Sequence, residues 1–189
     1  MGGITAADVA TYYGVQLMGG VILMGSFPYR SMQPLVTTPF VIDFTPRFLD
    51  PSLADFGPTA KEFAEACVAY GDKLDQGIKY SWMGALAGQY PDIRNWSITH
   101  TQNETALMAS SKTIPYLVLH GTLDKQVDGE KVRNFMNTYF GNFVFRMWEN
   151  TGHASFFDNP EKANPEIIAF AKRLSHVSFA FVMAPFGPL

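Results

Sequence analysis

The chain has 189 residues, of which 47% are hydrophobic, so it has the size of one ordinary domain and enough apolar material for a core. Its 14 Lys and Arg residues against 17 Asp and Glu give a formal net charge of -3 without the basic clusters that contact with a phosphate backbone requires, so nucleic acid is not an expected partner. The single cysteine, Cys67, excludes an internal disulfide, and no apolar run reaches the roughly 20 residues of a membrane span. The spacing of Cys67 from Phe63 predicts a buried apolar position on a helix.

Residues 1–27 predict a helix, a loop and a strand. Small and apolar residues between Ile4 and Tyr13 share one helical face, and Gly14 stands where a glycine commonly ends a helix. The run "VILM" that follows is bounded by Gly20 and Gly25 and is short enough to be a buried strand of a parallel sheet. These elements are typical of an α/β core.

Residues 28–111 are rich in proline and aromatic residues and predict helices without intervening strands. The helical patterns run from about Thr59 to Leu74 and from Ile78 to Gln89. We therefore expect a helical cap inserted into the α/β core. Six aromatic side chains are expected at the boundary between cap and core, either in ordinary packing or around an apolar acyl pocket: Phe27, Tyr29, Phe40, Phe44, Phe48 and Trp82.

Residues 112–174 return to the α/β pattern. "IPYLVLHG" and "NFVFRMWE" predict strands, and "DGEKVRNFMNTYF" and "NPEKANPEIIAFAKRL" predict the helices that follow them. Such alternation predicts a parallel sheet covered by helices on both faces. The apolar tail 175–189 fits no further element; it either packs on the sheet edge or is an aberrant C-terminus.

Two polar loops follow the two strands of this second core segment. Asp124 comes four residues after His120 at the end of the first strand, and His153 lies in a glycine-containing loop after the second. The carboxyl ends of parallel strands meet at one edge of a sheet, where open α/β folds place functional groups. A carboxylate there can orient an imidazole and stabilise the imidazolium that forms when the histidine acts as a general base.

The remaining acids and histidines have simpler expected roles. His120 is expected to be structural, Asp128 to cap the helix that starts near Glu130, and Asp158 to serve a helix end before Asn159. His100 and His176 have no partner at the spacing of metal ligands, so no metal site is expected.

Three stretches of the chain resemble the α/β-hydrolase fold family of lipases, esterases and peptidases. They are "MGGITAADVATYYGVQLMGGVILMGS", "HGTLDKQV" and "TGHASFFDNPEKANPEIIAFAKRL". The middle of the chain matches only loosely, where the family carries variable cap helices. The resemblance implies a partial α/β-hydrolase fold, a parallel sheet flanked by helices with a helical cap, in which Asp124 is the acid and His153 the general base of a Ser-His-Asp triad.

The resemblance also bears on the start of the chain. In this family the nucleophilic serine sits in a G-x-S-x-G turn between a strand and a helix. Met1, Gly2 and Gly3 match the last three positions of the family's form G-x-S-M-G-G, so the residue before Met1 would carry the nucleophile, and the Met1 amide would serve the oxyanion hole. An initiator methionine with a flexible tail is the alternative. Ser26 and Ser155 are available hydroxyls, but neither lies in a glycine-flanked strand-to-helix turn.

The expected function is therefore hydrolysis of a small, apolar carboxylic ester, or an amide, by the complete protein without a cofactor. The family's N-terminal strands are missing from these residues, so the chain alone should be inactive and should leave a strand edge open to pairing with another chain. The alternatives are a non-catalytic binding protein, a relative with an Asp nucleophile such as a dehalogenase or epoxide hydrolase, and a truncated gene model. The cytoplasm is the default compartment, which a targeting segment before Met1 would change.

Overall fold

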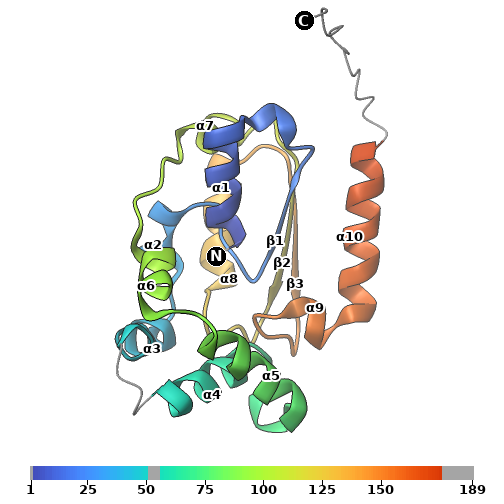
Figure 1. Cartoon of the computed structure of the whole chain (residues 1–189). Helices are drawn as coiled ribbons and strands as arrows, with labels where there is room; N and C mark the ends of the chain where they lie inside the picture. The colour runs from blue at the N-terminus through green and yellow to red at the C-terminus, as the bar shows by residue number, and fades with distance from the viewer. Residues whose placement is uncertain (1, 51–55, 176–189) are drawn as a thin grey trace, which may run out of the picture.

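The computed structural model describes residues 2–50 and 56–175, which form a parallel sheet of three strands with helices on both faces (Figure 1). The strands are β1 (Val21–Met24), β2 (Tyr116–Gly121) and β3 (Phe143–Trp148), in the order β1-β2-β3. All six residues of the central strand β2 are buried. The predicted α/β class, with a parallel sheet and helices on both faces, is confirmed.

Two helices cover one face of the sheet and one helix covers the other. Helices α1 (Gly2–Tyr13) and α8 (Gly129–Tyr139) lie together on one face, while α10 (Pro160–Ser175) lies on the opposite face (Figure 1). Val132 and Met136 of α8 are fully buried in the larger core cluster, and Phe170 of α10 packs in a second cluster. The expected cap at the start of α8 is confirmed, because Asp128 accepts a hydrogen bond from the Lys131 amide at 3.1 Å.

The described residues between β1 and β2 form helices and no strand. They are the 3-10 helix η2 (Arg30–Met32), α2 (Gln33–Val36), α3 (Pro39–Leu49), α4 (Phe56–Ala66), the 3-10 helix η3 (Gly71–Lys73), α5 (Gln76–Ala87), α6 (Pro91–Thr99) and α7 (Thr105–Ala109). Helices α3 to α6 lie at the carboxyl ends of the strands and along one side of the core (Figure 1). The two ends of this segment join the core, since Met32, Val36 and Leu107 belong to the larger core cluster. Its bounds of 28 and 111 stay a prediction, as does the division of the rest of the chain.

The first of the two predicted cap helices ends earlier than the sequence predicts. Helix α4 stops at Ala66, whereas the pattern continues to Leu74. Beyond Ala66 the backbone bonds to the loop after β3 instead: the Cys67 carbonyl accepts from the Ala154 amide at 2.7 Å, and the Ala69 amide donates to Asp158 at 2.9 Å. Helix α5 then starts at Gln76, where Asp75 accepts a hydrogen bond from the Ile78 amide.

Cys67 lies in this connection rather than on a helix. Its side chain is half-buried, and its Sγ accepts a hydrogen bond from Gln126 Nε2 at 3.3 Å. The prediction of a buried apolar position on a helix therefore holds only in part, since the side chain is half-buried and the helix ends one residue before Cys67. Burial still raises the pKa of the thiol to about 11, an effect that the Gln126 hydrogen bond opposes and the charge of Asp124 reinforces.

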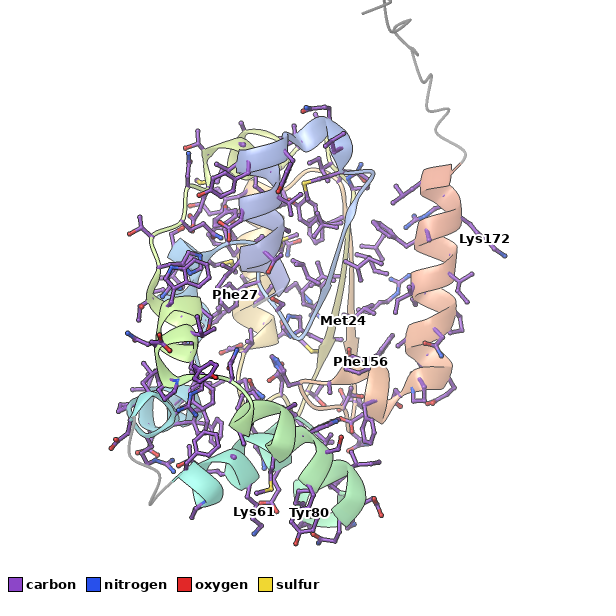
Figure 2. All side chains as sticks on the ribbon, viewed as in Figure 1. Met24, Phe27, Lys61, Tyr80, Phe156 and Lys172 are labelled. Carbon is purple, nitrogen blue, oxygen red and sulfur yellow. The ribbon has the colours of Figure 1, made fainter. Side chains whose placement is uncertain are left out.

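The side chains divide into those that pack between cap and core and those that point outward. Figure 2 shows Phe27 at the junction of the core with the cap, and Lys61 and Tyr80 on the outer side of cap helices α4 and α5. Within the described ranges, no helix is both long and apolar enough to cross a membrane.

Candidate active site

The acid turn follows β2 directly. Asp124 stands three residues beyond the last residue of this strand, and its side chain is 1% exposed. Its Oδ1 accepts hydrogen bonds from the amides of Gln126 at 2.8 Å and Val127 at 3.1 Å. These two bonds close the turn around the carboxylate and fix its direction.

His153 lies in the loop between β3 and the short helix α9 (Ser155–Asp158). Its Nδ1 is 3.1 Å from Asp124 Oδ2 and 3.2 Å from Oδ1. The carboxylate can only accept, so His153 Nδ1 carries a proton, and in the neutral imidazole Nε2 then has the lone pair. The structure thus brings together the two side chains that the sequence places after successive strands.

The Asp124 carboxylate is held in its charged form. Burial acts to raise its pKa, but the imidazoles of His120 and His153 and the Gln126 amide more than offset this, so that the pKa lies well below its ordinary value. A buried anion of this kind favours positive charge on the neighbouring imidazole. This is the electrostatic support that a histidine needs when it takes up a proton during a reaction.

Close backbone packing sets the position of the His153 loop. Gly25, directly after β1, has a φ of 56°, and a side chain there would lie 2.4 Å from the His153 carbonyl oxygen. On the other side, Asp158 Oδ2 accepts from the amides of Gly152 at 2.6 Å and Ala69 at 2.9 Å. Asp158 does occupy a helix end, but its carboxylate ties the histidine loop to the cap, a role that the sequence did not predict.

A second histidine connects the acid turn to the first turn of α1. His120 is fully buried, and its Nε2 donates to the Ser26 carbonyl oxygen at 2.9 Å, while its Nδ1 is 3.7 Å from Asp124 Oδ2. Ser26 Oγ in turn accepts from the Gly3 amide at 3.3 Å. A side chain on Gly3 would lie 1.7 Å from the Phe27 carbonyl oxygen, so only glycine allows the start of α1 to pack this closely.

A cavity of about 330 Å³ separates this site from the cap. His153, Gly25, Ser26 and Phe27 line it from the core, and the walls from the cap are mainly apolar, with Phe40, Phe44, Phe48, Phe63, Val41 and Leu86 among them. Four of the six aromatic residues expected at this boundary therefore line the cavity. Tyr29 instead packs with Phe140 in the core, and Trp82 packs edge-on against Phe157.

The other candidates are not part of this arrangement. Ser155 is fully buried at the start of α9, and its hydroxyl has no hydrogen-bond partner among the residues that the structure describes. His100 stacks on Trp96, with its Nε2 3.5 Å from Asp8 Oδ2.

No cluster of potential metal ligands occurs among residues 2–50 and 56–175. Met1, His176 and the apolar tail lie outside the described residues, apart from Ser175 at the end of α10.

No protein-family model matches the chain, and no curated protein is significantly similar to it in sequence. Solved structures do match. An esterase from a Rhodococcus species superimposes with a TM-score of 0.78 at 18% identity, over 92% of this chain and 62% of the esterase. A bromoperoxidase from Bacillus anthracis superimposes with a TM-score of 0.67 at 18% identity, over 91% of this chain and 64% of the bromoperoxidase. A 2-hydroxy-6-oxo-6-phenylhexa-2,4-dienoate hydrolase from Rhodococcus superimposes with a TM-score of 0.65 at 16% identity, over 91% of this chain and 61% of that hydrolase.

These matches share the α/β-hydrolase fold. The chain therefore has part of the α/β-hydrolase fold, as its three resembling stretches predict. It spans between 61% and 64% of the length of these three structures.

Proposed function

We propose that this chain supplies the acid and the general base of a hydrolase that cleaves carboxylic esters, or amides, by a Ser-His-Asp mechanism. The observation that carries the proposal is the contact of 3.1 Å between Asp124 Oδ2 and His153 Nδ1 at the carboxyl edge of the sheet. The imidazole of this pair also lines a largely apolar cavity. The fold of the chain, which known esterases share, supports the same reaction class.

In the proposed mechanism each side chain has its own step. His153 Nε2 takes the proton from a serine hydroxyl as its oxygen attacks the carbonyl carbon, and Asp124 stabilises the imidazolium. His153 then returns the proton to the departing alcohol or amine, which leaves an acyl-enzyme. A water molecule repeats the sequence: His153 removes its proton, the acid is released, and the serine hydroxyl is restored.

The serine in this proposal comes from a segment outside these 189 residues, positioned at the start of α1. No G-x-S-x-G sequence occurs in the chain. The first turn of α1 lies beside the site, because the Gly3 amide donates to Ser26 and Ile4 lines the same cavity as His153. A helix start offers amide donors and positive potential to an oxyanion, which supports the predicted contribution of the Met1 amide.

The substrate proposed is a small, apolar ester-like molecule, in keeping with the lining of the cavity. Without a nucleophilic serine in a G-x-S-x-G turn, the 189 residues alone should not turn over such a substrate. In the protease subtilisin, removal of the nucleophilic serine lowers kcat by a factor of about 10⁶.

Kinetics of a longer polypeptide that includes the preceding in-frame segment test the proposal. We expect His153→Ala to lower kcat by about 10⁶ and Asp124→Asn by about 10⁴, each with a small change in KM, because each residue acts mainly in the transition state. His100→Ala, a histidine substitution away from the site, should leave kcat near the original value. Near-normal kcat in His153→Ala would rule out its role as the base.

A further inference from the structure

Four phenylalanine side chains form a continuous stack along the cavity. Phe40, Phe44 and Phe48 follow one another on the same side of α3, with ring centroids 5.5 Å and 5.2 Å apart. Phe63 of α4 packs against both Phe44 and Phe48, at 5.6 Å and 5.8 Å. All four residues line the cavity that also contains His153, and we refer to them as the phenylalanine stack.

Charged contacts on the outer side of the cap hold this stack in place. Arg47 donates to Glu62 of α4 at 2.5 Å and to Asp43 at 2.8 Å, so it joins helices α3 and α4. Its guanidinium lies 5.9 Å from the centroid of the Phe44 ring. The rings are thus positioned before any ligand enters, which lowers the entropy cost of binding.

The size of the cavity limits what the stack can accommodate. An engineered cavity of about 150 Å³ with apolar walls binds benzene. At about 330 Å³, the present cavity has room for roughly twice that ligand. A group of two fused rings, attached to a carbonyl that reaches His153, fits this volume.

We propose that the phenylalanine stack makes the cavity selective for an aromatic group, such as a naphthyl ring system, over a saturated group with the same carbon skeleton. Aromatic rings gain offset or edge-to-face contacts at centroid distances of about 4.5–7 Å, beyond what their buried area contributes. A saturated group gains only the free energy that comes from burying its apolar area. The inference names the substrate class for the function proposed above, and it rests on that function.

Direct binding to the purified 189-residue chain tests the proposal without any turnover. The probes are methyl naphthalene-2-carboxylate and its fully saturated counterpart, methyl decahydronaphthalene-2-carboxylate, titrated by calorimetry. We expect the aromatic ester to bind about three- to tenfold more tightly. Equal or tighter binding of the saturated ester, or no binding of either, would overturn the proposal.

Single-ring substitutions localise the effect. Phe44→Leu and Phe63→Leu keep an apolar side chain but remove one ring of the stack, so each should move the affinity ratio toward one while the saturated ester binds as before. Phe135→Leu removes a ring of α8 that packs against Tyr29 and Tyr139 away from the cavity, and it should leave the ratio unchanged. A ratio that all three substitutions change alike would contradict a role for the stack.

The outcomes separate this inference from the proposed function. Aromatic selectivity in the 189-residue chain together with an active His153→Ala form of the longer polypeptide would refute only the catalytic assignment. Loss of activity in His153→Ala without aromatic selectivity would refute only the phenylalanine stack as a selector.

Discussion

A single residue, Asp124, makes the free energy of unfolding depend on pH through the charge of its carboxylate. Folding lowers the pKa of this carboxyl, so its stabilising contribution is fully present above the ordinary pKa of 3.8 and is lost as the pH falls through that value toward the folded one. Asp124→Asn should therefore unfold at a lower urea concentration than the original chain at about pH 7, with a smaller difference at about pH 3. A difference that stays constant over this range would contradict the assignment.

His120 supports the site through its hydrogen bond to Ser26 and its stacking on Phe145, whose ring is 5.6 Å away and nearly parallel. His120→Phe keeps a flat ring but leaves the buried Ser26 carbonyl without its donor, so unfolding in urea should show a loss of about 1–3 kcal/mol. His120→Gln, which retains an N–H donor, is the matched control and should lose less. Equal losses in both variants would show that the hydrogen bond is unimportant.

The sequence predicts individual residues well where the cause is local. Asp128 caps α8 through an amide three residues away, and Asp124 and His153 are marked by strands that end just before them. The role of Asp158 could not be predicted in this way. Its bond to the Ala69 amide spans 89 positions and depends on how the cap meets the histidine loop.

An ion pair between a buried lysine and a partly exposed glutamate joins cap helices α4 and α5. Lys79 Nζ is 2.6 Å from Glu65 Oε1, with side chains that are 4% and 28% exposed. Hydrogen bonding to Lys79 lowers the pKa of Glu65 despite the opposing effect of burial.

The two partners of this pair should respond unequally to substitution. Glu65→Gln leaves the buried Lys79 ammonium without its carboxylate and should cost about 3 kcal/mol. Lys79→Met fills the same space with an apolar side chain, while Glu65 stays partly exposed with Lys61 3.6 Å away, so the loss should be about 1 kcal/mol or less. Urea unfolding measures both, and an equal or larger loss in Lys79→Met would contradict this account.

Prediction of whole elements succeeded where periodicity alone decides. The strands and the flanking helices follow from apolar runs and helical spacing, and α1 ends at Tyr13, directly before the expected glycine. It failed at the end of α4, where the pattern continues to Leu74 but the backbone of residues 67–69 bonds to the loop after β3. The long-range contact outweighs the local preference for helix.

At the scale of the whole molecule, the sheet has an edge at β1. Among the described residues, β1 pairs with β2 alone. Three apolar side chains are exposed at the end of α1 and in the turn after it: Tyr12 (79%), Tyr13 (67%) and Leu17 (68%). An unpaired strand edge and exposed apolar side chains each favour association. We expect light scattering to show self-association of the 189-residue chain as its concentration rises, and a monomer for the longer polypeptide. A chain that stays monomeric at the highest concentration it reaches would contradict this expectation.

Asp124 and His153 are proposed to activate a serine held at the start of α1. A fluorophosphonate probe, which attaches covalently to an activated serine, tests it when applied to the protein from its native cells and followed by mass spectrometric mapping of the label. We expect a label on a serine immediately before Met1, abolished by His153→Ala. A label on Ser26 or Ser155, or one that His153→Ala leaves unchanged, would contradict it.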